Sequence, residues 1–373
     1  MTFTAPNNGS PEPGQSREEL ETPVALVDLE TMEANMSEFA SFAREHDVAL
    51  RSHVKTHKSP VLARRQEALS GNEGIICQTL HEAEVMAEYG LSDIYLSYMV
   101  VTRSKLDRLV RLSESIDSFA TTVDCPGNIE PLQEAGARHG RSIDTVLELD
   151  IGLNRVGVEP GEKALELARS IVEAENLNFA GVMAYEGHIN TLADSEGDYE
   201  RRCLEAMDSV EAMVERLEGD GIPVDGVKVG STGTSRYSGK HPVVTEINPG
   251  MYPFNDANVL SWNGPVEETD CALTMLTTVI SKPTDERVVV DAGSKAMSFD
   301  LDCDPIPNGR DDIAYRNASE EHGWIDIGGT DQSIEVGDRL EFIVPHVCTT
   351  INLHERVVGM RDGLVEDVWT VRA

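Results

Sequence analysis

Two lysines stand three residues apart in the stretch RSHVKTHKSP, residues 51–60, and each closely follows a histidine. The whole chain has only 8 lysines, so a basic cluster here is unusual. If a strand runs through this stretch, Arg51, His53 and Lys55 share one face, because side chains alternate along a strand. A lysine enclosed by protein loses solvation, which makes its amine more easily neutral and nucleophilic. We therefore expect chemistry from Lys55, against the usual alternative of a solvated surface lysine.

The second lysine of the stretch has a different setting. Ser59 and Pro60 suit the N-cap and the first position of a helix. Lys58 would then lie just outside a helix start, and we expect it to be structural or to support the local charge.

A small-residue loop is the natural partner of such an amine. The sequence GSTGT, which consists of Gly230, Ser231, Thr232, Gly233 and Thr234, follows an apolar run that predicts a strand. Small residues let backbone N–H groups turn toward an anion, and threonine hydroxyls add donors. A flexible turn is the alternative for this string alone. An amine that faces a phosphate-binding loop is the arrangement that pyridoxal phosphate chemistry needs.

The third chemical element is late in the chain, in VPHVCTTINLHE. His346 and Cys348 are two apart, so on a strand both side chains would face the same way. Imidazole and thiolate are good zinc ligands, and an incomplete set suits a catalytic metal, which needs open positions. A buried cysteine beside a hydrogen-bonded histidine is the alternative.

These groups require elements that bring them together. Between about residues 48 and 250, eight short apolar runs alternate with helical patterns, which predicts a (β/α)₈ TIM-type barrel in the α/β class. A doubly wound open sheet is the rival, but it usually carries a glycine-rich dinucleotide turn that is missing here. In a barrel, catalytic groups lie at the carboxyl ends of strands. Polar residues gather at the predicted strand ends: Gln78, Ser97, Tyr98, Asp150, Arg155, Tyr185, His188, Tyr252, Asn255 and Asp256.

The division of the chain follows from this pattern. Residues 1–20 are expected to form a disordered polar tail, and residues 21–30 a strand that joins the C-terminal domain. Residues 31–258 would form the cofactor-binding barrel. Strand-like runs separated by turn residues fill 259–373, which we expect to form a β-rich domain carrying the metal pair.

Composition limits the classes of function. The chain has 66 acidic and 31 basic residues, a formal charge of −35. Dense carboxylates with few lysines are typical of a halophilic protein, and such a field repels nucleic acid. The 40% of hydrophobic residues argues against an intrinsically disordered chain. Six scattered cysteines, no long apolar run and no signal-peptide pattern lead us to expect a cytoplasmic protein without membrane partners.

Taken together, RSHVKTHKSP, ELDIGLNRVGV, AYEGH, GSTGT, NPGMYPFND, VVVDAGSKA and PHVCTTINLHE resemble the D-threonine aldolase and D-serine dehydratase family. These are alanine-racemase-like, fold-type III pyridoxal phosphate enzymes. The resemblance covers nearly the whole chain outside the tail. It implies a pyridoxal 5'-phosphate cofactor, a divalent metal (zinc before manganese), a β-rich domain that completes the site, and a homodimer.

Individual roles also follow from the resemblance. Lys55 matches the lysine that carries the cofactor, and GSTGT matches the loop that binds its phosphate. Arg155 and Tyr185 fall where the family contacts the pyridoxal ring, and Tyr252 is taken as a further cofactor contact. The pair near the C-terminus matches the metal ligands. His57 matches a family histidine whose role the sequence does not assign.

The resemblance implies a lyase acting on 3-hydroxy-D-amino acids, with two possible reactions. The His-x-Cys pair favours dehydration of D-serine or D-threonine, whereas TTINLHE and DAGSKA are closer to D-threonine aldolases, and AYEGH departs from both patterns. A racemase would need a second base, commonly a tyrosine of the β-rich domain, and only Tyr315 is available there. A non-catalytic pyridoxal phosphate carrier would resemble the barrel alone.

Overall fold

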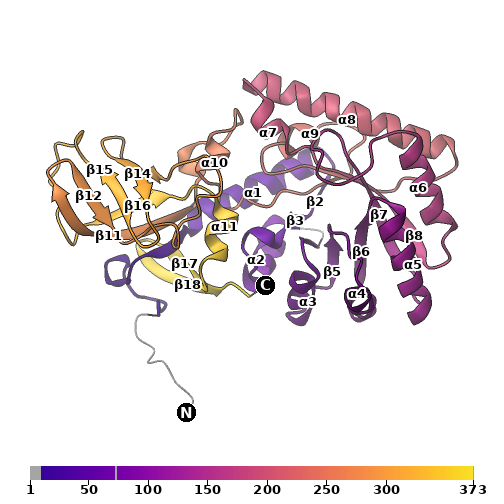
Figure 1. The fold of residues 1–373 in the computed structure, drawn as a ribbon, viewed down its shortest axis with the longest axis horizontal. Helices are drawn as coiled ribbons and strands as arrows, with labels where there is room; N and C mark the ends of the chain where they lie inside the picture. The colour runs from indigo at the N-terminus through magenta and orange to yellow at the C-terminus, as the bar shows by residue number, and fades with distance from the viewer. Residues whose placement is uncertain (1–9, 72–73, 373) are drawn as a thin grey trace, which may run out of the picture. The chain divides into compact units, whose positions relative to one another are not determined.

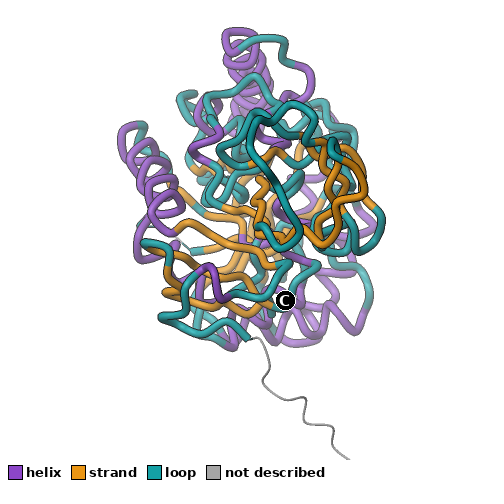
Figure 2. Tube along the Cα trace, turned by 90° about the vertical axis from the view of Figure 1, so that its left-hand side faces the viewer, coloured by secondary structure: helices purple, strands orange, loops and turns teal. Residues whose placement is uncertain are grey.

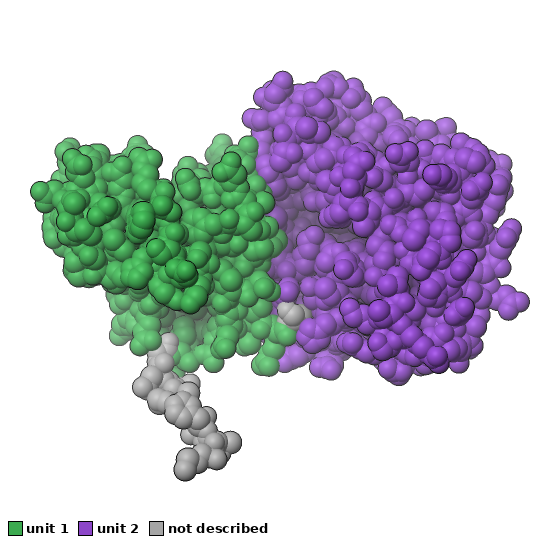
Figure 3. All heavy atoms as spheres, in the orientation of Figure 1, with its two compact units in different colours: residues 1–35, 253–261, 266–372 green, residues 36–252, 262–265, 373 purple. Residues whose placement is uncertain are grey.

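The computed structural model describes residues 10–71 and 74–372, which form two compact units (Figure 3). Unit 1 contains residues 10–35, 253–261 and 266–372, and unit 2 contains residues 36–252 and 262–265. The boundary near residue 35 falls inside helix α1 (Leu29–Glu45). The predicted end of the barrel at residue 258 therefore differs from the division of the structure, in which 253–261 belong to unit 1.

Unit 2 is a parallel β-barrel surrounded by helices (Figure 1). Its strands are β2 (Ala49–Leu50), β3 (Ser52–His53), β4 (Ile75–Cys77), β5 (Asp93–Leu96), β6 (Ser118–Val123), β7 (Ile143–Leu149), β8 (Leu177–Ala184), β9 (Val227–Val229) and β10 (Glu246–Ile247). Their order is β2-β10-β9-β8-β7-β6-β5-β4-β3. The order begins and ends on the first barrel strand, which is divided at Arg51. The predicted (β/α)₈ barrel is thus confirmed, with its first strand in two pieces.

Local sequence explains where the barrel helices begin. Thr79 Oγ1 accepts the N–H of Glu82 at the start of α3, and Ser195 Oγ accepts the N–H of Asp198 at the start of α8. The helices are α2 (Pro60–Ser70), α3 (Leu80–Glu88), α4 (Arg103–Ser115), α5 (Pro126–His139), α6 (Glu162–Glu173), α7 (Ile189–Leu192), α8 (Glu196–Gly219) and α9 (Ser235–Ser238). No helix in the described part of the chain is long and apolar enough to cross a membrane.

An ion network surrounds Arg51, the residue between β2 and β3. Arg51 Nη1 lies 2.8 Å from Asp93, and Arg51 Nε lies 3.0 Å from Glu246. Lys228 Nζ lies 3.3 Å from the same Glu246 carboxylate. Arg51 therefore links the first barrel strand to β5 and β10.

The strand register assumed for Lys55 is also wrong. The strand ends at His53, and residues Val54–Thr56 form a 3₁₀ turn in which the His53 ring accepts the Lys55 backbone N–H. Alternation along a strand therefore does not set the direction of Lys55.

Unit 1 consists mostly of strands and loops (Figure 2). Its strands are β1 (Val24–Asp28), β11 (Leu273–Thr284), β12 (Arg287–Val290), β13 (Ile306–Pro307), β14 (Ala314–Ala318), β15 (Gly323–Asp326), β16 (Arg339–Ile343), β17 (Arg356–Arg361) and β18 (Leu364–Thr370). Its short helices are α10 (Ala257–Leu260) and α11 (Val347–Asn352), with 3₁₀ turns at Arg17–Glu19 and Glu268–Asp270. The N-terminal strand β1 lies between β11, to which it is antiparallel, and β17, to which it is parallel.

The N-terminal tail differs in part from the prediction. Residues 1–9 of the expected disordered segment lie outside the described residues. Residues 10–20 are packed: Leu20 is buried with Leu26, Leu276 and Val358, and Gly14 N–H donates to the Val365 carbonyl oxygen at 2.8 Å. Burial of Leu20, backbone hydrogen bonds to residues 363–365 and the Arg17–Glu341 ion pair hold this polar segment.

Candidate functional site

A pocket lies in unit 2 at the carboxyl ends of the barrel strands. The lining comes from residues of the strands and from the segments that follow them: His53, Lys55, Ile76, Gln78, Ser97, Arg155, Met183, Tyr185, Gly230, Ser231, Thr232, Asn248, Gly250, Met251 and Trp262. The structure therefore brings Lys55 to the start of the GSTGT loop, although 175 residues separate Lys55 from Gly230 in the sequence.

Three of the predicted cofactor-binding residues do not line this pocket. Tyr252 is fully buried, with its hydroxyl 2.7 Å from Ser52 Oγ and its ring 4.5 Å from that of Phe39. It packs behind the first strand, because an apolar ring with one satisfied hydroxyl belongs in the core. Gly233 and Thr234 belong to the loop but are not among the lining residues, and the Thr234 hydroxyl accepts the Ser231 N–H.

A chain of hydrogen bonds fixes the backbone at Lys55. Gln78 Nε2 donates to the Ser97 carbonyl oxygen at 3.0 Å, so Gln78 Oε1 faces His53 Nε2, also at 3.0 Å. His53 Nε2 must then carry the ring proton, and Nδ1 accepts the Lys55 N–H at 3.4 Å. Burial, followed by the charge of Lys55, holds the pKa of His53 well below its usual value. His53 is thus a neutral support for the lysine.

The second histidine of the motif supports the next helix. His57 Nδ1 accepts the Ser59 N–H at 3.0 Å, and His57 Nε2 donates to Gln66 Oε1 at 2.9 Å. Burial lowers the pKa of His57 to about 4, so the ring is neutral. His57 therefore satisfies the first turn of α2, a role that sequence alone did not assign. Lys58 lies 4.0 Å from Glu82 and adopts a positive φ of 50°.

A charged side chain, Arg155, and an aromatic one, Tyr185, form one wall of the pocket. The Arg155 guanidinium lies 5.0 Å from the centroid of the Tyr185 ring, a cation–π contact. Arg155 Nη2 also lies 3.9 Å from Glu148 at the end of β7. Burial raises the pKa of Glu148 to about 7, although Arg155 opposes this shift. The charge of this wall therefore changes near neutral pH.

The GSTGT loop is braced by its own side chains. Thr234 Oγ1 accepts the Ser231 N–H at 2.8 Å, and Ser231 Oγ accepts the Thr234 N–H at 3.3 Å. Below the loop, the fully buried Glu186 accepts the Gly230 N–H at 3.2 Å. Within the described residues, no hydrogen bond uses the N–H groups of Thr232 and Gly233. These two N–H groups are the available donors for an anion.

The residues fit a phosphorylated cofactor that reacts with an amine. Two buried oxygen atoms here, Asn248 Oδ1 in the pocket lining and Ser235 Oγ next to Gly230, lack a hydrogen-bond partner in the described chain. Buried polar atoms without partners are uncommon and mark places where a ligand or water binds. Lys55, Thr232 and Asn248 thus bring an amine, an anion donor and an unsatisfied polar atom into one pocket, and Ser235 lies next to Gly230 of its lining.

The predicted metal pair lies in unit 1, at the start of α11. His346 is the N-cap residue and Cys348 lies in the first turn, so the predicted strand is wrong at this point. The reason is that β16 ends at Ile343, and the buried Asp256 accepts the Val347 N–H at 2.7 Å, which begins a helix. The two side chains still meet, because Cys348 hydrogen-bonds the His346 ring.

The environment of the pair suits a divalent metal. Asp300 Oδ2 lies 2.9 Å from His346 Nδ1. Burial lowers the pKa of His346, but Cys348 and Asp300 outweigh it and raise this pKa to about 9. An imidazole and a thiol that compete for one proton are an apt ligand pair for a metal that replaces the proton.

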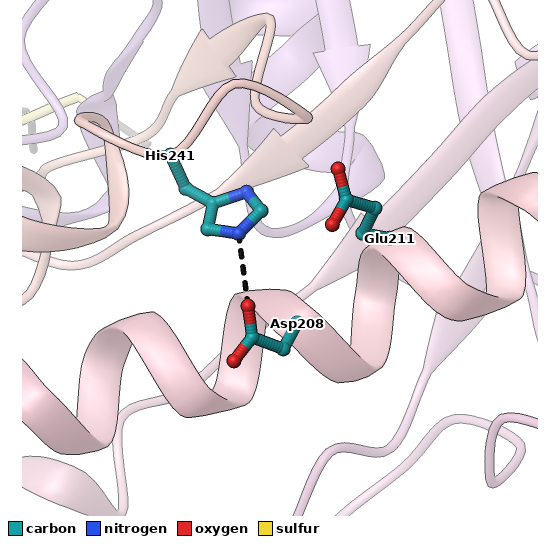
Figure 4. A group of neighbouring side chains, drawn as sticks. All are labelled: Asp208, Glu211 and His241. Carbon is teal, nitrogen blue, oxygen red and sulfur yellow. Dashed lines mark hydrogen bonds and ion pairs between the residues drawn. The ribbon is translucent and has the colours of Figure 1, made fainter.

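A different group of potential ligands, Asp208, Glu211 and His241, lies on α8 and in the segment before β10 (Figure 4). His241 Nδ1 accepts the Val243 N–H at 3.3 Å, so its proton is on Nε2, which donates to Asp208 at 3.2 Å. A metal at Nε2 would move the proton to Nδ1, against the Val243 N–H. We therefore interpret the group as a hydrogen bond between His241 and Asp208 with the Glu211 carboxylate beside it, and not as a metal site.

Some pocket residues escaped the sequence interpretation. Trp262 lies beyond the predicted barrel boundary and carries no motif. Gly250 and Met251 belong to the quoted string NPGMYPFND, but no role was given to them. A Cβ atom on Gly250 would lie 3.2 Å from the Cβ of His53, so a side chain here would crowd the support of Lys55. Tyr315, the only tyrosine considered for a racemase base, is buried and donates to the Ala292 carbonyl oxygen.

Family models match both parts of the chain. The model of the alanine racemase N-terminal domain matches residues 27–257, and that of a putative serine dehydratase domain matches residues 272–360. The first match alone covers more than half of the chain. The chain therefore belongs to the D-threonine aldolase and D-serine dehydratase family of alanine-racemase-like pyridoxal phosphate enzymes.

Particular relatives refine this position. The 3-hydroxy-D-aspartate aldolase of Paracoccus denitrificans (strain Pd 1222) is 34% identical, over 97% of this chain and 94% of its own. The D-threo-3-hydroxyaspartate dehydratase of Delftia sp. (strain HT23) is 29% identical, over 89% and 92%. The crystal structure of D-threonine aldolase from Filomicrobium marinum superposes with a TM-score of 0.91 at 32% identity, and the match covers 96% of this chain and 97% of that one.

Proposed function

We propose that this protein is a pyridoxal phosphate-dependent lyase that cleaves 3-hydroxy-D-amino acids with the help of a divalent metal. The observation that carries this proposal is the meeting of Lys55 with the GSTGT loop in one pocket at the carboxyl ends of the barrel strands. That pocket has an amine for the cofactor aldehyde and a loop for its phosphate. Relatives named aldolases and dehydratases on the same fold support the lyase class.

The pocket residues divide the work as follows. Lys55 would hold the cofactor through its amine and would take or return a proton at the substrate. The N–H groups of Thr232 and Gly233 bind the phosphate. Arg155 and Tyr185 orient the ring from one side, and Glu148 orients Arg155. The cofactor supplies an electron sink for the carbanion formed next to the amine.

We further propose that His346 and Cys348 hold the metal that acts on the substrate's 3-hydroxyl. A divalent metal supplies a Lewis acid that lowers the pKa of that hydroxyl or makes hydroxide a better leaving group. Asp256 accepts the N–H of Val347, the residue between the two ligands. Asp300 is hydrogen-bonded to the imidazole ring of His346.

Of the two expected reactions, we propose aldol cleavage to glycine and an aldehyde first. The support is the higher identity to proteins named aldolases, 34% and 32%, than to the named dehydratase, 29%. This reverses the preference taken from the His-x-Cys pair alone. Dehydration to a 2-oxo acid and ammonia stays the second candidate, because Cys348 provides the thiol that favoured it.

Product analysis tests the proposal. The purified protein, with pyridoxal phosphate and Mn²⁺ or Zn²⁺ at high salt, is incubated with D-threonine, 3-hydroxy-D-aspartate or D-serine. Glycine with acetaldehyde or glyoxylate supports aldol cleavage, and ammonia with a 2-oxo acid supports dehydration. The L-enantiomers and the Lys55→Ala variant serve as controls. If no D-substrate gives either product pair, the proposed function is wrong.

A further inference from the structure

The carboxylate of Asp300 is the centre of a hydrogen-bonded group in unit 1. Ser298 Oγ donates to Oδ1 at 2.8 Å, and Thr349 Oγ1 donates to the same oxygen at 2.9 Å. His346 Nδ1 lies 2.9 Å from Oδ2 and 3.1 Å from Oδ1. Asp300 belongs to the loop between β12 and β13, far in sequence from both metal-pair residues.

This arrangement determines which ring nitrogen of His346 is available. A carboxylate can only accept hydrogen bonds, so His346 Nδ1 must carry a proton and donate it to Asp300. In the neutral ring, Nε2 then has the lone pair, which is what a metal requires. His241 shows the opposite case, since its Nδ1 accepts a backbone N–H and its proton is on Nε2.

The same carboxylate also reaches the second ligand's helix. Thr349 follows Cys348 directly in α11, so its bond to Asp300 ties the first turn of that helix to the loop that holds the His346 ring. One side chain thus restrains both the imidazole and the turn that carries the thiol.

We propose that Asp300 is the positioning residue of the metal site, fixing the tautomer and the orientation of His346 without binding the metal itself. The inference rests on the proposed function in one respect, namely that His346 and Cys348 bind a divalent metal. Partners of this kind that hold a ligand histidine contribute about 10–100-fold to metal affinity.

Co²⁺ titration of the full-length metal-free protein tests this role, with a competing chelator to set the free Co²⁺ concentration. The thiolate-to-Co²⁺ absorption band reports Cys348. We expect Asp300→Ala to raise the Co²⁺ dissociation constant about 10–100-fold while the band returns at saturation. Asp302→Ala removes the same charge from an exposed neighbour and should leave the constant within about twofold.

A second variant and a rescue separate positioning from a general structural effect. Thr349→Val keeps the carboxylate but removes one of its donors, so its loss of affinity should be smaller than that of Asp300→Ala. Excess metal should restore turnover of Asp300→Ala. The proposal is overturned if Asp300→Ala binds Co²⁺ as tightly as wild type, or if its band is lost even at saturation, because Cys348 would then fail to bind the metal and Asp300 would do more than position His346. If the wild-type protein fails to bind Co²⁺, the proposed metal function is wrong as well.

Discussion

Glu186, a fully buried carboxyl beneath the GSTGT loop, offers a sharp test of how the loop is held. Its Oε2 accepts the Gly230 N–H at 3.2 Å, and its Oε1 accepts the Ser238 hydroxyl at 2.6 Å. The Glu186→Ala change leaves both donors buried without a partner, at a cost of about 1–3 kcal/mol each. The Ser238 hydroxyl can rotate to another acceptor but the Gly230 N–H cannot. We therefore expect a loss of about 2–4 kcal/mol in the free energy of unfolding.

The Glu186→Gln variant is the matched control. Its amide oxygen can accept the Gly230 N–H, and its amide N–H can donate to Ser238 Oγ, so it should stay within about 1 kcal/mol of wild type at pH 7. Urea unfolding at high salt, followed by tryptophan fluorescence, measures both variants, and titration with pyridoxal phosphate measures the loop. Glu186→Ala should bind the cofactor more weakly. Equal unfolding free energies for Glu186→Ala and wild type would refute the reasoning, as would a Gln variant as unstable as the Ala variant.

The same pair of variants carries a pH signature. Burial raises the pKa of Glu186, so the folded state binds this proton more tightly than the unfolded state does. The stability that this proton contributes is present below the carboxyl's ordinary pKa of 4.5 and is lost as pH rises through the raised value. As pH rises from about 4.5, wild type should therefore lose stability at this position while Glu186→Gln does not. The unfolding free energy of Glu186→Gln should increase relative to that of wild type.

Three further outcomes are expected. Lys55→Ala should abolish the visible absorption band of the lysine-bound cofactor, whereas Lys58→Ala should keep it; the reverse result would contradict the assignment of the lysine. The pKa of Glu148 is about 7, so protonation of Glu148 below that pH should weaken its ion pair with Arg155 and lower kcat/KM on the acid side. Glu148→Gln should flatten the acid side of the pH profile of kcat/KM. A profile of Glu148→Gln that equals that of wild type would count against this role. Gly181→Ala should cost more than about 1 kcal/mol in unfolding free energy, since φ is +105° and the new Cβ would lie 2.0 Å from a backbone oxygen; thermal unfolding at the wild-type temperature would disprove this.

The sequence determined the elements whose patterns are local. Apolar runs alternating with helical periodicity gave the barrel, because each strand and helix is set by the burial of its own residues. The string GSTGT marked a loop after a barrel strand, and its first three residues line the pocket. The pair Ser59–Pro60 correctly placed the start of α2.

Only the tertiary structure decided which side chains meet and in which chemical form. Arg51 lies between β2 and β3, and its ion-pair partners Asp93 and Glu246 are distant from it in the sequence. Tyr252 stands in the predicted site motif yet packs against Phe39, since burial of its ring outweighs its position in the string. His346 and Cys348 meet at a helix start and not on a strand, because Asp256 captures the N–H between them.

The protonation of the histidines is the clearest case of this division. His53, His57 and His346 are equivalent as letters of a sequence, but each ring's tautomer depends on a partner that only the fold supplies. Gln78 and Gln66 place the proton on Nε2 of the first two rings, and Asp300 places it on Nδ1 of the third. Hydrogen bonding to partners that the fold supplies thus makes two of these rings structural supports and leaves Nε2 of the third ring as the nitrogen not bonded to Asp300.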